Sequence, residues 1–356
     1  MKKAKYEKIY ETLREQITSG AVAQGERLPS KRMIAQRYGV SVITAEHALM
    51  LLEDEGYCIA RQRRGYFAAW RAQNIFPVGT AGDSGRGAPL ATVAPPFPTG
   101  AYQKAVRRVL SEEGNALLGK TENEGLLQLR RAIARYLHRS RGVIVTPEQI
   151  LIGSGAEYLY TLIVFLLGTR RRYATEAPCY EKIEKIYRLH GIRPQGLAMG
   201  SDGIQSEALA ACHAQVLHLT PYHSFPSGIT ATAQKRAEYL AFAEEKNAIL
   251  IEDDFGSEFY SARRPMQTLF EADGGRRVIY LNTFAKTVAT GVRIGYMILP
   301  QQISQAQKEK ISFLSCPVPT LSQYVMAQLL DSGDFERNLN RTIRARQKEE
   351  KQRQKP

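Results

Sequence analysis

The stretch YLNTFAKTVATGVRIGY, residues 280–296, places a lysine directly after an apolar segment that is typical of a buried strand. Lys286 lies between small residues, Thr283 precedes it by three positions, and Arg293 follows it by seven. A lysine in this setting can form a Schiff base with a carbonyl group. Thr283 and Arg293 can hold a phosphate on either side of that lysine. The stretch therefore predicts a chemical site at the end of a strand.

Segments around this stretch alternate between helical and short apolar patterns, which is typical of an α/β domain. The helices we expect are GLLQLRRAIARYLHRSRG (125–142) and EYLYTLIVFLLG (157–168). The strands we expect are QILIG (149–153), VLHLT (216–220), AILIEDD (248–254), RVIYLNTF (277–284) and RIGYMILP (293–300).

A small-residue turn links one predicted strand to the helix that follows it. It consists of Gly153, Ser154, Gly155 and Ala156. Such residues let backbone N–H groups approach an anion at a helix N-terminus, where the helix dipole favours phosphate. A Gly-Ser-Gly sequence is, however, more often only a turn.

Two other groups also lie at the ends of predicted strands. The run Glu252-Asp253-Asp254 can bind a metal, cap a helix or pair with a cationic ring nitrogen, and no nearby histidine supports the metal. On another loop, Pro178 precedes Tyr180, whose ring can stack on a flat cofactor. Each group alone is more often an ordinary turn or surface feature, so only their combination indicates a site.

The first seventy residues predict three helices followed by a hairpin. Apolar residues near the N-terminus recur at helical spacing. The segments LPSKRMIAQRYG (28–39) and SVITAEHALMLLEDEG (41–56) indicate two more helices, with Ser30 and Ser41 as N-terminal caps. A short Gly-Val-Ser turn joins the two, as in a helix-turn-helix. The segment YCIARQRRGYFAAW (57–70) then predicts a basic hairpin, or wing.

Basic residues gather where these elements would meet double-stranded DNA. Lys31 and Arg32 lie at a predicted helix start, while Arg61, Arg63 and Arg64 lie on the predicted hairpin. From there they can reach phosphates or groove edges. A basic helical domain that contacts proteins is the alternative, but helix order, wing and charge all agree with DNA binding.

The net charge of +14 is unevenly distributed along the 356 residues. Residues 1–71 hold 13 Lys and Arg against 8 Asp and Glu, and residues 335–356 hold 8 against 3. Basic ends favour a polyanionic partner, most often nucleic acid.

The four cysteines contain no C-x-x-C pair, so we expect neither a metal site nor a disulfide framework. No apolar run approaches the roughly 20 residues of a membrane span, and no signal-peptide core is present, so we expect a cytoplasmic protein without membrane contact.

Composition also predicts how the chain divides. We expect a DNA-binding unit over 1–70, a flexible linker over 71–100, an α/β domain over 101–340 and a charged tail over 341–356. The linker sequence VGTAGDSGRGAPLATVAPPFPTG is rich in Gly and Pro and shows no apolar period. A tether of this kind lets two units move relative to each other.

The N-terminal segments resemble the GntR-type winged-helix family. Its hallmarks L-P-S-x-R and V-S-R-x-T stand here as LPSKR (28–32) and VSVIT (40–44). Val42 stands where the family usually has an arginine on its recognition helix, and Glu46 where another basic residue is common. We therefore expect contacts mainly with the DNA backbone. The residues implied are Ser30, Lys31, Arg32, Ser41, Thr44, Arg61, Arg63 and Arg64.

The larger part resembles the fold-type I pyridoxal-phosphate enzymes, specifically the aminotransferase class I/II domain of MocR-like regulators. The resemblance implies a mainly parallel sheet with helices on both faces, and pyridoxal 5'-phosphate as the cofactor. The segments that carry it occur in family order, and they are LRRAIARYLHRSRGV (129–143), TPYHSFPSG (220–228), IEDDFGSEF (251–259) and YLNTFAKTVATGVRIGY (280–296).

The same resemblance implies roles for individual residues. Lys286 would hold the cofactor as an internal aldimine, Asp253 would pair with the pyridine nitrogen, and Tyr180 would stack on the ring. Phe255 stands near the phenolic oxygen, where the family usually has a tyrosine donor. The residues implied around the phosphate are Ser154, Gly155, Ala156, Thr283 and Arg293.

We therefore expect a pyridoxal-phosphate-dependent transcription regulator that senses the cofactor or an amino compound through Lys286. We expect a homodimer, with one winged helix for each half-site on DNA. Relatives continue into a small C-terminal domain with an arginine for the substrate carboxylate, so at most weak transaminase activity is expected here. Two alternatives remain, an active aminotransferase with an added DNA-binding domain and a DNA-binding protein whose degenerate sensor binds nothing.

Overall fold

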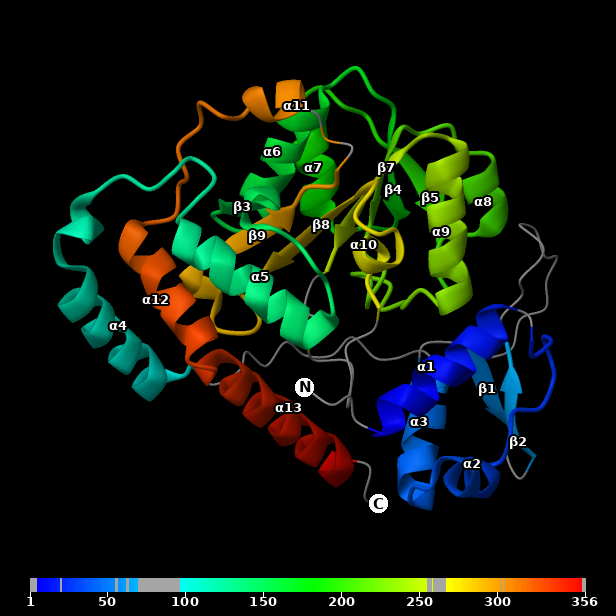
Figure 1. Ribbon diagram of the computed structural model, residues 1–356. Coiled ribbons are helices and arrows are strands. Elements are labelled where there is room, and N and C mark those ends of the chain that lie inside the picture. Colours follow the sequence, from blue (N-terminus) through cyan, green and yellow to red (C-terminus); the bar gives the residue numbers. More distant parts are fainter. Residues whose placement is uncertain are drawn as a thin grey trace.

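The chain forms a winged-helix unit near its N-terminus and a larger unit built around one sheet (Figure 1). Within the part of the chain that is described, no helix is both long and apolar enough to cross a membrane. This computed structural model describes residues 5–19, 21–54, 57–61, 64–69, 97–254, 258, 267–301, 303 and 305–353.

The winged-helix unit has its elements in the order predicted from the sequence. The hairpin strands pair antiparallel, and the apolar faces of the three helices form a separate core of their own. The elements are α1 (Lys5–Thr18), α2 (Lys31–Tyr38), α3 (Val42–Asp54), β1 (Cys58–Arg61) and β2 (Gly65–Ala68).

Local sequence signals determine where α2 and α3 begin and end. Ser30 Oγ accepts a hydrogen bond from Met33 N at 3.3 Å, which caps α2, and Gly39 ends that helix with a left-handed φ of 58°. Ser41 Oγ accepts from Thr44 N at 3.1 Å at the start of α3. Both predicted caps are therefore present, and the turn between them sets the angle between the two helices.

The larger unit contains a seven-stranded sheet in the order β3-β9-β8-β7-β6-β4-β5. β9 runs antiparallel to both of its neighbours, and the other neighbouring pairs are parallel. The expected mainly parallel α/β sheet is thus confirmed. The strands are β3 (Ile150–Gly153), β4 (Tyr173–Ala177), β5 (Gln195–Ala198), β6 (Val216–Leu219), β7 (Ile249–Asp253), β8 (Val278–Thr283) and β9 (Gly295–Ile298).

Helices cover both faces of this sheet, as Figure 1 shows. The inner strand β8 shows why, because its side chains alternate between two apolar cores: Val278 and Tyr280 join one, Ile279 and Leu281 the other. The helices of the larger unit are α4 (Thr99–Glu113), α5 (Leu127–Arg141), α6 (Ala156–Leu167), α7 (Glu181–Leu189), α8 (Ser206–Ala210), α9 (Ala233–Glu245), α10 (Leu269–Ala272), α11 (Gln305–Glu309), α12 (Thr320–Asp331) and α13 (Asp334–Arg353).

Among the described residues, several contacts link the winged-helix unit to the larger unit, and two of them are clear. Arg14 Nη1 of α1 donates to Gln267 Oε1 at 3.3 Å. Ala233, at the start of α9, packs with the apolar core of the winged helix. The backbone oxygen of Gln267 also accepts a hydrogen bond from Tyr222, which follows β6. Gln267 therefore contacts both the winged helix and the segment that follows β6.

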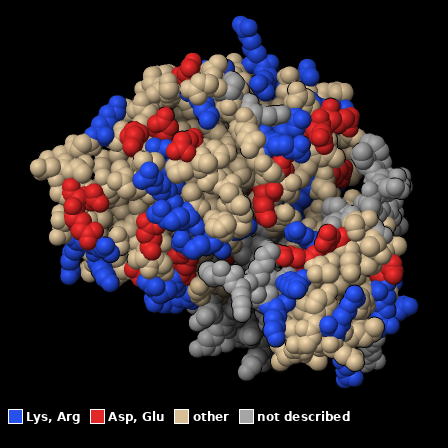
Figure 2. Space-filling view, in the orientation of Figure 1, with Lys and Arg blue, Asp and Glu red and all other residues tan. Residues whose placement is uncertain are grey.

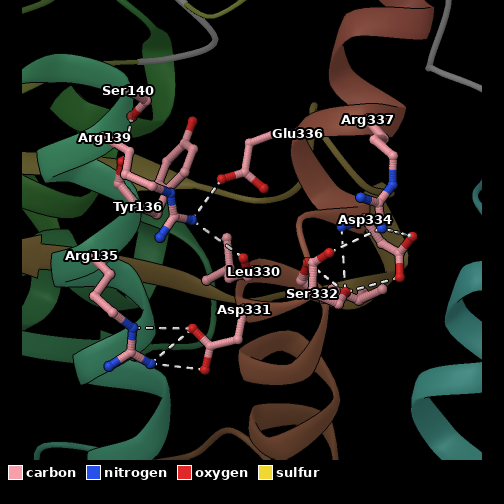
Figure 3. Close-up of polar contacts among 11 residues, drawn as sticks. Arg135, Tyr136, Arg139, Ser140, Leu330, Asp331, Ser332, Asp334, Glu336 and Arg337 are labelled. Atoms are coloured by element: carbon pink, nitrogen blue, oxygen red, sulfur yellow. Dashed lines mark hydrogen bonds and ion pairs between the residues drawn. The ribbon is translucent and has the colours of Figure 1, made fainter. Parts of the chain in front are cut away.

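A buried ion pair fixes the end of β7 against α5. Arg141 Nη2 lies 2.8 Å from Asp254 Oδ2, and the two side chains are only 2% and 0% exposed. Tyr280 OH donates to the same carboxylate oxygen at 2.6 Å. A buried charge is tolerated only when it is paired, so each partner requires the other. By contrast, Arg135 of the same helix pairs with Asp331 of α12 on the exposed surface (Figure 3).

Replacing Arg141 by methionine should therefore lower the free energy of unfolding by about 3–5 kcal/mol, because Asp254 is left buried without its cation. The matched change Arg135→Met should cost about 1 kcal/mol or less, because its pair is exposed. Urea unfolding followed by circular dichroism measures both. Equal losses in the two variants would contradict the role assigned to the buried pair.

Candidate cofactor site and DNA-binding surface

The residues singled out in the larger unit lie at one edge of the sheet, where the parallel strands end. Asp253 ends β7, Thr283 ends β8 and Gly153 ends β3. β3 runs in the same direction as β8, because β9 lies between them and is antiparallel to both. Lys286 follows β8 by three residues and is half-buried. In open α/β sheets this edge is where ligands bind.

The turn after β3 and Arg293 lie against each other and together form a cradle at the start of α6. Ala156 begins α6, and Arg293 Nη2 donates to Ser154 O at 3.2 Å. Gly155 has a φ of 86°, and a Cβ at that position would lie 3.0 Å from Arg293 Cζ. A side chain is therefore disfavoured there by both backbone and space. The glycine lets the guanidinium lie against the N-terminus of α6, which favours an anion.

Glu157, in the first turn of α6, forms ion pairs with two basic side chains beside this cradle. Lys182 Nζ lies 2.6 Å from one carboxylate oxygen, and Arg293 Nη2 lies 2.8 Å from the other. These two hydrogen-bonded cations hold the pKa of Glu157 at about 2, against an ordinary value of 4.5. Glu157 is therefore ionised at neutral pH and competes with any bound phosphate for Arg293.

Asp253 is held in place by groups from two other elements. Tyr160 of α6 donates a hydrogen bond to Asp253 Oδ2, and His218 Nε2 of β6 lies 3.7 Å from the same oxygen. The other ring nitrogen of His218 shares a 2.7 Å hydrogen bond with the hydroxyl of Tyr187. Within the part of the chain that is described, His218 Nε2 has no hydrogen-bond partner. This arrangement fixes a buried carboxylate at the strand end, where it can receive a cationic nitrogen.

The two carboxylates beside Asp253 have structural roles. Glu252 accepts from Leu269 N and Phe270 N at 2.8 and 2.9 Å, so it caps α10, and burial together with the charge of Asp254 raises its pKa to about 8. Asp254 binds Arg141. Of the three uses considered for this run, Glu252 therefore serves as a helix cap. Among the described residues, no cluster of His, Cys, Asp and Glu is arranged to hold a metal.

The loops after β4 and β6 complete this edge. Tyr180 precedes α7, is half-buried and meets Phe225 edge-to-face at 6.1 Å between ring centroids. Glu176 is buried and accepts from Ser224 Oγ at 2.5 Å and from Thr220 N at 3.1 Å. Burial outweighs these hydrogen bonds and raises the pKa of Glu176 to about 7.

His223 approaches the lysine from the loop after β6. It has a left-handed φ of 49°, which is unusual for a residue other than glycine. Burial, and then the nearby charge of Lys286, lower the pKa of His223 to about 4. The imidazole is therefore neutral at pH 7, and it lies close enough to Lys286 for the charge of that lysine to lower its pKa.

Sequence reasoning missed several of these side chains. A usable signal existed for His218, because it is the polar residue in the otherwise apolar strand VLHLT. No comparable signal marks Tyr160, Glu176 or His223, whose partners are distant in the sequence. Phe255, expected near the cofactor's phenolic oxygen, lies outside the described residues.

The predicted DNA-binding residues lie on the exposed side of the winged-helix unit. Arg32 and Arg64 are exposed, and Arg61 lies over the ring of Phe67, 4.8 Å from its centroid. Lys31 forms a 2.7 Å ion pair with Glu46 of α3. Figure 2 shows several Lys and Arg side chains around uncharged surface on this unit, at the lower right. Arg63, at the predicted hairpin tip, lies outside the described residues.

Residues 90–355 match the model of a protein family described as aminotransferase class I and II. The chain belongs to this family. Residues 5–67 match a second model, described as bacterial regulatory proteins of the gntR family, and these residues span the winged helix. The aminotransferase family domain and the GntR helix-turn-helix thus account for both units seen in the fold.

Several known proteins are similar to this chain across nearly its whole length. YhdI of Bacillus subtilis, an uncharacterized HTH-type transcriptional regulator, is 29% identical over 350 residues, covering 94% of this chain and 74% of the relative. The HTH-type pyridoxine biosynthesis transcriptional regulator PdxR of Corynebacterium glutamicum is 29% identical, with 94% and 75% coverage. MocR of Rhizobium meliloti, a probable rhizopine catabolism regulatory protein, is 28% identical, with 95% and 74% coverage.

Solved structures resemble the aminotransferase family domain. Kynurenine aminotransferase of Pyrococcus horikoshii is 25% identical with a TM-score of 0.63, and the match covers 72% of this chain and 66% of that one. LysN of Thermus thermophilus, an α-aminoadipate aminotransferase, is 26% identical with a TM-score of 0.60 and covers 71% and 66%. The chain thus spans slightly less than two thirds of these enzymes.

Glu176 provides a pH-dependent test of this site. An unfolded chain ionises Glu176 near its ordinary pKa of 4.5, whereas the folded chain keeps the proton to about 7. The wild-type protein therefore loses stability as pH rises from 4.5 to 7, and the loss remains above 7. Glu176→Gln removes this loss, so its stability relative to wild type should rise by on the order of 3 kcal/mol between pH 4.5 and 8.

Denaturant unfolding of both proteins across this pH range measures the effect. The control is Glu181→Gln on α7, because Lys185 lowers rather than raises the pKa of Glu181. That variant should gain no stability as pH rises. A relative stability of Glu176→Gln that is constant with pH would contradict the buried, protonated state of Glu176.

Proposed function

We propose that this chain is a transcription regulator that binds DNA through its winged helix and pyridoxal phosphate through its aminotransferase family domain. The proposal rests on one observation above all, the joining of a GntR helix-turn-helix to that domain in a single chain. Relatives with the same two parts are named as HTH-type transcriptional regulators. We further propose that the chain acts in the cytoplasm as a homodimer with two winged helices for two half-sites.

The residues at the strand ends fit pyridoxal phosphate, the cofactor that the family match indicates. Gly155 leaves room for the Arg293 guanidinium at the N-terminus of α6, which suits a phosphate. Asp253 offers a buried carboxylate to a pyridine nitrogen, beside the unpartnered Nε2 of His218. Lys286 supplies an amine between them in the fold. When bound, the cofactor supplies an electrophilic carbonyl carbon and an electron-accepting ring.

We assign the following roles to the chain's own residues. Lys286 would hold the cofactor through its amine, and the neutral imidazole of His223 beside it can accept a proton. Asp253 would pair with the ring nitrogen, while Tyr160 orients that carboxylate. Tyr180 would lie against the ring. The phosphate would be held by Ser154, Gly155, Ala156, Thr283 and Arg293.

We propose that an amino compound, or the cofactor itself, acts as the effector at Lys286. We propose with it the division expected from the sequence, a DNA-binding unit over 1–70, a linker over 71–100, the sensor over 101–340 and a charged tail over 341–356. Tyr222, next to His223, donates to the Gln267 backbone, and the Gln267 side chain accepts from Arg14 of the winged helix. A change at Lys286 thus has a short route to the DNA-binding unit.

Lys286→Ala should abolish covalent retention of the cofactor, because the amine that reacts with its carbonyl group is gone. The measurement is mass spectrometry after incubation with pyridoxal phosphate, borohydride reduction and denaturation. Lys182→Ala, which removes a lysine at the same edge of the sheet, is the control and should still be labelled. Labelling of the Lys286→Ala protein equal to wild type would refute the assignment.

Arg32→Gln and Arg64→Gln should each flatten the dependence of log binding constant on log salt by about 0.9, because each lost phosphate contact releases one counterion fewer. The probe is a duplex of arbitrary sequence, since phosphate contacts carry no sequence information. Arg108→Gln, which removes an exposed arginine of α4, should leave the slope unchanged. Slopes that do not differ between wild type and the Arg32 and Arg64 variants would contradict phosphate contact.

A further inference from the structure

The outer face of the recognition helix α3 begins with apolar side chains. Ile43 is 74% exposed and Val42 is 39% exposed, both in the first turn. On the opposite side, Ala45, Ala48 and Leu49 are fully buried in the winged-helix core. Ile43 therefore lies on the face that points away from the protein. In a helix-turn-helix, the N-terminal residues on this face contact base edges in the major groove.

The polar side chains around this turn are engaged in contacts within the protein. Ser41 Oγ and Thr44 Oγ1 lie 2.8 Å apart, and Ser41 also caps the helix. The Glu46 carboxylate, one turn after Ile43, is paired with Lys31 Nζ at 2.7 Å. Val42 and Ile43 themselves carry no side-chain donor or acceptor. We therefore do not expect the first turn of α3 to recognise bases through side-chain hydrogen bonds.

The major groove offers one apolar group that such side chains can recognise, the C5 methyl of thymine. We propose that Ile43, with Val42 beside it, reads thymine methyl groups in the operator of this protein. This inference rests on the proposed DNA-binding function and adds its sequence preference. Exposed basic residues, including Arg32 and Arg64, lie on the same unit and complement the phosphates on either side of the groove.

Loss of a buried methyl contact lowers affinity about fourfold. Removing the C5 methyl groups from a bound duplex should therefore weaken binding by at least that factor. Deoxyuridine is the suitable probe, because it pairs as thymidine does and lacks only this methyl. The same weakening should follow from shortening the side chain that contacts the methyl.

The experiment starts from a DNA duplex library with a randomised centre, from which the full-length protein selects its sites in the presence of pyridoxal phosphate. Selected duplexes are made in two forms, with thymidine or with deoxyuridine at every such position. Affinities are measured for wild type, Ile43→Ala and the matched control Ile144→Ala. Ile144 is 82% exposed and lies on the larger unit, so its truncation leaves the recognition helix intact.

Wild type and Ile144→Ala should bind the uridine form at least about fourfold more weakly per contacted methyl. Ile43→Ala should show a clearly smaller difference between the two forms, because only Val42 remains to contact a methyl group. Equal affinity of wild type for the two forms would overturn the proposal while leaving DNA binding intact. A uridine effect of undiminished size in Ile43→Ala would also overturn it, since Ile43 then does not read the methyl groups. Failure to bind any duplex would refute the DNA-binding function as a whole.

Discussion

Three consecutive acidic residues, Glu252, Asp253 and Asp254, are buried at the end of β7, and each is held by a different part of the chain. A buried polar or charged group without a partner is costly, so their placement constrains the elements around them. Glu252, whose pKa is raised to about 8, binds the start of α10, Asp253 binds α6 and β6, and Asp254 binds α5 and β8. One strand end thereby fixes the positions of the elements that surround the proposed cofactor site.

Much of this arrangement could be read from the sequence, because strands and helices of the α/β domain leave a local pattern. Lys286, Arg293 and the turn at Gly155 were all predicted as strand-end residues. β4 and β5 were not expected, because YATEA and QGLA contain too few apolar residues to mark a strand. The carboxylate run was ambiguous for a different reason. Its donors are far away in the sequence, and local pattern carries no information about them.

In the winged helix too, contacts between neighbouring residues follow from the sequence, whereas contacts between distant residues do not. Caps at Ser30 and Ser41 follow from two or three neighbouring residues, so the helix boundaries were predictable. The Lys31–Glu46 pair joins α2 to α3 across the turn, and only the folded arrangement shows that the two charges meet. The start of α3 beside this pair carries the exposed apolar side chains of Val42 and Ile43. We therefore assign backbone attraction and base recognition to different side chains of one small unit.

The buried Arg141–Asp254 pair has a consequence for how this domain can evolve. A single substitution at either position leaves a lone charge in the interior, whereas replacing both at once with apolar residues removes the requirement for a partner. The two positions are 113 residues apart, yet a substitution at one changes what the other position can tolerate. Among homologous sequences they should therefore be retained together or exchanged together, and intermediates with one partner should be rare.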